Sequence, residues 1–164
     1  MNYHNITNVD MVNGEGLRVV LWLSGCSHAC PSCHNQKTWD PASGILFDGE
    51  AKQELFNYLQ AEYISGVTLS GGDPFYIDHR EEVKELLKEI KRSFPQKSIW
   101  VYTGYIMEEI SDPHLLESID VLVDGMFIEA LSSVEYPWAG SENQRIIDVA
   151  KSLKEGEVVL YENH

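Results

Sequence analysis

The chain has 164 residues, 43% of them hydrophobic, which suffices for one sizeable core, so we expect a single domain spanning residues 1–164. Twelve basic against 26 acidic side chains give a net charge of −14, which argues against nucleic acid as a partner because phosphate backbones would be repelled. The first residues lack a basic region followed by an apolar run, and no stretch approaches the ~18 apolar residues of a membrane span, so we expect a cytoplasmic protein without membrane contact.

The first third of the chain leads into a loop that contains all three cysteines. Residues 3–18 are expected to be irregular, with turns at Asn13–Gly14 and Glu15–Gly16. The apolar run 18–23 predicts a strand buried on both faces of a parallel sheet. The cysteines follow its carboxyl end, where α/β folds place their chemistry.

Cys26, Cys30 and Cys33 form a C-x3-C-x2-C motif. Three thiolates at this short spacing suit an iron–sulfur cube with four irons, one of which would lack a protein thiolate and could accept an outside ligand. Two other interpretations fit the same residues. Cys30 and Cys33 alone could be a redox dithiol, which leaves Cys26 without a role. A zinc site could add His28 or His34, although four ligands in nine residues lack the usual second ligand pair.

A second turn of interest follows the next predicted strand, residues 66–70. Between the two strands, residues 35–47 are expected to be a loop, and Asp48 is the predicted N-cap of a helix. Gly71 and Gly72 would let the backbone approach a ligand closely, and the Asp73 carboxylate would accept hydrogen bonds from an ammonium group. The same residue types also make an ordinary tight turn with a capping aspartate.

The clearest helical pattern runs from Asp78, as N-cap in a capping box with Glu81, to Phe94. Residues 98–103 return as a strand, and this strand–helix–strand order predicts a right-handed crossover in a parallel sheet. At the end of that strand, Thr103 and the following glycine form either a turn or a wall of a ligand pocket.

The last third is expected to hold two helical pieces over residues 105–118, broken before Pro113, and then a strand over 119–123. Asp124 follows, where it could bind a ribose hydroxyl or cap a turn. Residues 128–144 form a long irregular stretch with an expected binding role. Residues 145–149 and 157–161 are predicted to be a closing pair of short strands.

Several separate motifs, in order, resemble the radical S-adenosylmethionine superfamily and, within it, the activating proteins of anaerobic ribonucleoside-triphosphate reductases. The resemblance covers the chain from Met1 to about Arg145. The residues that carry it are the cysteine motif with Ser24, Gly25, His34 and Asn35, together with the segments 10–18, 70–74 and 100–105.

The resemblance implies a fold and an activity. The chain is shorter than the ~250 residues of a complete eightfold barrel, so an open, partial β/α barrel with a mostly parallel sheet is expected. The implied activity is reductive cleavage of S-adenosylmethionine at a [4Fe-4S] cluster, after which the 5′-deoxyadenosyl radical takes a glycine hydrogen from the reductase large subunit. A low-potential electron donor such as flavodoxin and a possible homodimer are further expectations. The alternatives are activation of another glycyl-radical enzyme, such as pyruvate formate-lyase, a small-molecule radical reaction, and a non-catalytic zinc module.

The resemblance also assigns site residues. Cys26, Cys30 and Cys33 would hold the cluster, and the residues that would contact S-adenosylmethionine are Ser32, Cys33, His34, Gly71, Gly72, Asp73, Thr103 and Asp124. The turn after residue 70 would hold its amino group, and the backbone of residues 32–34 would contact adenine in place of the usual aromatic side chain. Met126 and Ala139 stand where relatives often have Lys and Arg, and Arg145 is the candidate to replace that Arg.

Overall fold

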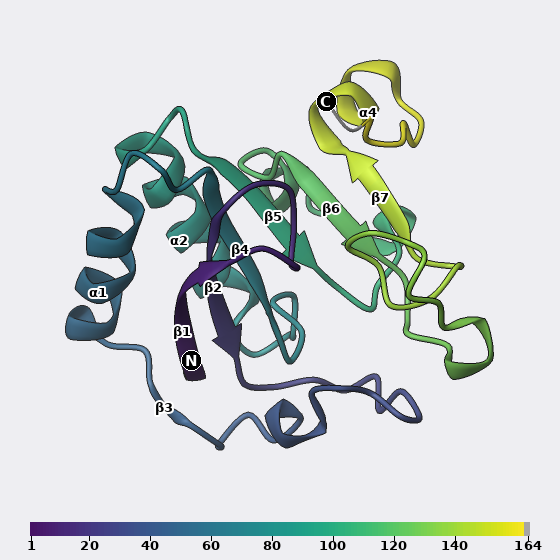
Figure 1. The fold of residues 1–164 in the computed structure, drawn as a ribbon, viewed down its shortest axis with the longest axis horizontal. Coiled ribbons are helices and arrows are strands. Elements are labelled where there is room, and N and C mark those ends of the chain that lie inside the picture. Colours follow the sequence, from purple (N-terminus) through teal and green to yellow (C-terminus); the bar gives the residue numbers. More distant parts are fainter. Residues whose placement is uncertain (163–164) are drawn as a thin grey trace.

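The computed structural model describes residues 1–162 and shows an α/β fold around a seven-stranded sheet with the order β3-β1-β2-β4-β5-β6-β7 (Figure 1). The four central strands run parallel: β2 (Arg18–Leu23), β4 (Gly66–Gly71), β5 (Ser98–Tyr102) and β6 (Val121–Asp124). The flanking strands β1 (Asn2–Asp10), β3 (Ile45–Leu46) and β7 (Arg145–Asp148) pair antiparallel. The sheet is therefore mixed and only partly parallel.

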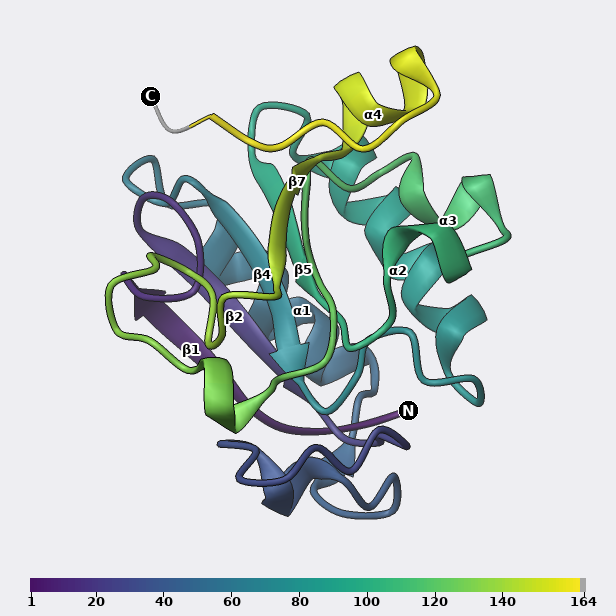
Figure 2. The same ribbon diagram turned by 90° about the vertical axis from the view of Figure 1, so that its right-hand side faces the viewer.

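Helices cover one face of this sheet. They are α1 (Gly49–Leu59), α2 (Arg80–Ser93), the short α3 (Pro113–Leu116) and, after β7, α4 (Val149–Glu155); single 3₁₀ turns lie at Gln36–Thr38, Met107–Glu109 and Glu129–Leu131. Because side chains alternate along a strand, residues such as Leu21, Leu69 and Val101 join the core with α1 and α2. The opposite face carries Trp100 and Val123, which pack with Trp138 from the loop of residues 128–144 and with Tyr161. Figure 2 shows this loop on the side of the sheet away from α2. No helix within residues 1–162 is long and apolar enough to cross a bilayer.

Arg18 ties the amino-terminal ends of three parallel strands together. Its side chain is fully buried and donates to the Thr68 hydroxyl at 2.9 Å and to the carbonyls of Val67 and Ser98 at 2.9 and 2.7 Å. Burial lowers the pKa of Arg18 to about 10. Because this value is still well above neutral pH, the guanidinium stays charged. These contacts fix the base of β2, β4 and β5, so their carboxyl ends are presented together.

Several sequence predictions are confirmed. Asp48 caps α1 by accepting a hydrogen bond from the Ala51 amide at 3.0 Å. The four central strands lie where they were expected, and Pro113 occupies the first turn of α3.

Two predictions near the amino-terminal half are wrong. Residues 2–10 form strand β1 instead of an irregular segment, because they pair with β2 through two register shifts that spoil any alternating pattern. Helix α2 begins at Arg80 with His79 as its N-cap and no side-chain cap, so Asp78 does not cap it. Successive turns, in which the Tyr76 amide bonds the Asp73 carbonyl and the His79 amide bonds the Tyr76 carbonyl, delay the start of the helix.

The predicted closing pair of strands is half right. β7 is present and pairs antiparallel with β6, but residues 149–155 form helix α4, which Asp148 caps through the Lys151 amide at 3.0 Å. Gly156 ends this helix in the left-handed conformation, with φ 72°. Beyond it, the expected second strand is reduced to one antiparallel bridge between Ile147 and Leu160.

Candidate functional site

A cavity of about 840 Å³ lies where the parallel strands end. Each of the four central strands contributes the residues that follow it: the three cysteines after β2, Gly72 and Asp73 after β4, Thr103 and Gly104 after β5, and Gly125 and Phe127 after β6. Segments far apart in the sequence, from Cys26 to Phe127, are thus brought to one site, as expected for the carboxyl end of a parallel sheet.

The cysteine loop is shaped by its backbone. Ala29 and Ser32, on either side of Cys30, adopt left-handed conformations with φ 51° and 59°, which turn the chain sharply around it. Cys30 is buried, and Cys26 and Cys33 are partly exposed. Burial raises the pKa of the Cys26 thiol to about 11 and also raises that of Cys30. The thiolate forms of Cys26 and Cys30 would therefore need positive charge nearby to be stable.

This donor set fits an iron–sulfur cube. Within residues 1–162, no three His, Cys, Asp or Glu side chains converge as the ligands of a single metal ion do. In a cube each cysteine binds a different iron, so three thiols around a common cavity are the arrangement required. Soft sulfur ligands also favour iron–sulfur clusters, whose ferric and ferrous ions supply the missing positive charge.

Asp73 joins three segments of the site through one buried carboxylate. Oδ1 accepts from the Phe75 amide and the Thr103 hydroxyl, each at 2.9 Å. Oδ2 accepts from the Gly104 amide at 3.0 Å and lies 2.5 Å from His28 Nε2. His28 belongs to the cysteine loop, so Asp73 connects that loop with the ends of β4 and β5.

The two glycines before Asp73 are required by close backbone packing. A Cβ at Gly71, which has φ 93°, would lie 2.6 Å from the Leu23 carbonyl oxygen, and one at Gly72 would lie 2.5 Å from that of Gly25. Their freedom lets the turn after β4 lie directly against the cysteine loop, where the Asp73 amide bonds the Gly25 carbonyl at 2.7 Å.

Comparison with known proteins agrees with this geometry. A family profile described as "4Fe-4S single cluster domain" matches residues 12–147. The anaerobic ribonucleoside-triphosphate reductase-activating protein of Enterobacteria phage T4 is 44% identical over 146 residues, covering 89% of this chain and 93% of the relative. The proteins of that name from Haemophilus influenzae and Escherichia coli strain K12 are 43% and 40% identical, with 89% and 88% of this chain and 97% and 96% of theirs covered. The chain belongs to this family of reductase-activating proteins.

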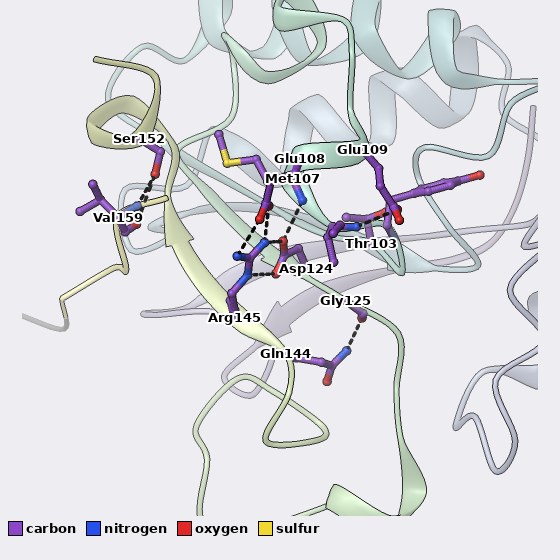
Figure 3. Close-up of polar contacts among 12 residues, drawn as sticks. Thr103, Met107, Glu108, Glu109, Asp124, Gly125, Gln144, Arg145, Ser152 and Val159 are labelled. Carbon is purple, nitrogen blue, oxygen red and sulfur yellow. Dashed lines mark hydrogen bonds and ion pairs between the residues drawn. The ribbon is translucent and has the colours of Figure 1, made fainter. Parts of the chain in front are cut away.

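The structure does not bring every predicted residue of this reductase-activating protein to the cavity. His34 and Thr103 line it, whereas Ser32 and Asp124 are not among the lining residues. Asp124 is fully buried and is held by Arg145 Nε at 3.0 Å and by the Met107 amide at 2.8 Å (Figure 3). Arg145 is therefore occupied by carboxylates, including Glu108 at 2.6 Å.

Three lining residues of the activating protein had no assigned role from the sequence. The Phe127 ring packs on His34, with ring centroids 5.2 Å apart. Gln144 lines the cavity and donates to the Gly125 carbonyl at 3.0 Å. Tyr102 also lines it, and among the described residues its buried hydroxyl has no hydrogen-bond partner. Tyr102 lies in the segment 100–105 that carries the family resemblance, and Gln144 lies in the stretch 128–144 with an expected binding role, whereas the only sequence signal for Phe127 was its position after a predicted strand.

Proposed function

We propose that this protein activates an anaerobic ribonucleoside-triphosphate reductase by generating a glycyl radical on its large subunit. The observation that carries the proposal is the shared cavity of the three cysteines and the Asp73 turn, in a chain of this family. When bound, a reduced [4Fe-4S] cluster supplies one electron that cleaves S-adenosylmethionine to methionine and a 5′-deoxyadenosyl radical, which takes the glycine hydrogen and leaves as 5′-deoxyadenosine.

In this proposal Cys26, Cys30 and Cys33 each bind one iron. The sequence has no other cysteine, so a fourth iron would have no thiolate from this chain and would be open to the amino and carboxylate groups of S-adenosylmethionine. The partial burial of the loop would keep water from the cluster while leaving one side accessible from the cavity.

Asp73 would orient S-adenosylmethionine by accepting hydrogen bonds from its ammonium group. Thr103 and Gly104 already hold this carboxylate from the β5 side. The remaining contact on Oδ2 is His28 Nε2 at 2.5 Å, on the loop that forms the cavity. The ammonium would therefore take the place of His28.

Adenosine would be contacted by the backbone of residues 32–34 and by the neighbouring walls of the cavity. His34 and Phe127 offer ring faces, and Gly72 and Gly125 leave room for close approach. Asp124 would reach a ribose only if Arg145 released it, so we expect the wall after β6 to contribute through Gly125 instead.

The arrangement of layers supports an open, partial barrel. The long helices α1 and α2 pack on one face of the sheet, and the cavity is lined in part by Tyr102 and Trp138 from the other face, as in a barrel whose interior is reached from an unclosed side. An opening of this kind would admit a glycine-bearing segment of the reductase. The proposal includes a low-potential electron donor such as flavodoxin, because each cleavage consumes one electron.

Anaerobic purification tests the proposal. We expect a brown protein with about four irons per chain, and a glycyl-radical spectrum after the reductase, S-adenosylmethionine and a reductant are added. The Cys30→Ala variant should cleave no S-adenosylmethionine. A colourless protein with stoichiometric zinc would refute the cluster, and radical formation on pyruvate formate-lyase but not on the reductase would refute the partner.

A further inference from the structure

Tyr102, the last residue of β5, lines the cavity with a polar group that the fold leaves unused. Its buried hydroxyl has no hydrogen-bond partner among residues 1–162. The other buried side-chain polar atoms without a partner in that range belong to Trp39 and Asn143, which do not line the cavity. Buried tyrosine hydroxyls usually have a partner, because an unpaired polar group away from water costs free energy. The Tyr102 hydroxyl is therefore available to a bound ligand.

The strand separates this hydroxyl from the groups that hold Asp73. The Thr103 amide donates to the Val123 carbonyl at 2.9 Å, so the extended pairing of β5 continues through residue 103 and neighbouring side chains point to opposite sides. The Thr103 hydroxyl bonds the Asp73 carboxylate at 2.9 Å. Tyr102 packs instead on the face of the sheet that carries Trp100. The two hydroxyls therefore serve different parts of the cavity.

Two segments that line the same cavity expose apolar side chains to solvent. Met11 and Val12, in the loop between β1 and β2, are each 71% exposed, and Val134 and Tyr136, in the loop of residues 128–144, are exposed as well. Exposed apolar side chains gathered around a cavity are typical of a surface that binds another protein chain. These side chains would pack against the partner, and the cavity that they line would admit its backbone.

We propose that the Tyr102 hydroxyl binds the peptide backbone of the glycine-bearing segment of the reductase. This inference rests on the proposed function, in which that glycine enters the cavity to lose a hydrogen. A glycine has no side chain, so only its peptide groups can be recognised, and each needs a partner when it leaves water. A tyrosine hydroxyl can donate to a peptide carbonyl or accept from a peptide amide. Packing of the Tyr102 ring against Trp100 and Val123 holds the hydroxyl in place.

The test removes this one oxygen. Tyr102→Phe keeps the ring, and it breaks no side-chain hydrogen bond of the fold, because the hydroxyl has no partner among residues 1–162. The matched control, Tyr63→Phe, removes the hydroxyl of an exposed tyrosine outside the cavity. Both variants are prepared without oxygen as full-length, cluster-loaded proteins, and their iron content is measured. Equilibrium dissociation constants are then measured for S-adenosylmethionine and, with S-adenosylmethionine present but no reductant, for the reductase large subunit.

We expect the dissociation constant of the reductase to rise about tenfold in Tyr102→Phe, as for one lost hydrogen bond to a buried peptide group. The dissociation constant of S-adenosylmethionine should not change, and neither constant should change in Tyr63→Phe. Wild-type affinity for the reductase in a Tyr102→Phe protein with full iron content would overturn the inference. An equal loss of affinity for S-adenosylmethionine would also overturn it, because the hydroxyl would then contact that ligand. If the wild-type chain forms no glycyl radical on the reductase, the proposed function fails, and this inference with it.

Discussion

The buried carboxylate of Asp124 and the guanidinium of Arg145 are cross-strand partners that form an ion pair at the end of β6, with contacts of 3.0 and 2.5 Å. Glu108 binds the outer side of the same guanidinium and has its pKa lowered by it. Asp124 also accepts from the Met107 amide, so the pair connects β6, β7 and the turn after β5. The ion pair therefore fixes the end of β6, directly before the cavity-lining residues Gly125 and Phe127.

Replacing Arg145 by Met should destabilise the fold, because among residues 1–162 the fully buried Asp124 carboxylate would keep only its bond to the Met107 amide. Breaking a buried pair costs about 3–5 kcal/mol, and the partial exposure of Arg145 reduces this to about 2–3 kcal/mol. Urea unfolding at neutral pH measures the difference in the free energy of unfolding.

The double variant Asp124→Asn with Arg145→Met should recover part of this loss, since no buried charge is left unpaired. The control, Arg92→Met, changes an exposed arginine in the last turn of α2 and should stay within about 0.5 kcal/mol of wild type. A similar loss of unfolding free energy in Arg145→Met and Arg92→Met would show that the ion pair with Asp124 contributes no more to stability than an exposed arginine does.

The sequence predicted those parts of the site whose functional residues lie close together in one short segment. The cysteine spacing and the residues after β4 and β5 locate the cavity, because parallel strands bring their carboxyl ends together whatever their helices do. Contacts between distant loops have no such local signal. The bonds from Asn143 and Gln144 to the segment after β6 depend on the antiparallel return of β7, whose direction the sequence did not reveal.

The contact between His28 and Asp73 yields a prediction of opposite effects. Asp73→Asn removes the charge that would hold an ammonium group, so its affinity for S-adenosylmethionine should fall at least about tenfold. His28→Ala frees Oδ2 of the carboxylate from the contact at 2.5 Å, so the same affinity should be kept or increase. Anaerobic equilibrium binding to the cluster-loaded proteins measures both.

His114→Ala, at an exposed histidine paired with Glu117, is the control for removing an imidazole and should bind as wild type does. Iron content is measured in every variant, because loss of the cluster would lower binding for another reason. A large loss of affinity in His28→Ala would contradict displacement of His28 and would indicate that this ring contacts the ligand itself.

Tyr102 provides a test on the ligand-free protein. Within residues 1–162 its buried hydroxyl has no hydrogen-bond partner, and burial raises its pKa. Leaving a polar group buried and unpaired costs about 1–3 kcal/mol, so Tyr102→Phe should leave stability unchanged or increase it by about 1 kcal/mol. Thermal unfolding without added ligand measures this change. A clear loss of stability would mean that the hydroxyl has a partner in solution, such as ordered water.

The two aspartates that the sequence marked as helix caps should differ in their contribution to stability. Asp48 accepts from the Ala51 amide at 3.0 Å, so Asp48→Ala should lower the free energy of unfolding by about 1 kcal/mol. Asp78 lies before a helix whose N-cap is His79 and has no such bond, so Asp78→Ala should change it by less than about 0.5 kcal/mol. Urea unfolding of both variants, at the same pH and with the same replacement, compares them directly. Equal losses would place the true start of α2 at Asp78, as its capping-box pattern had predicted, and would show that the turns between Asp73 and His79 do not delay the helix in solution.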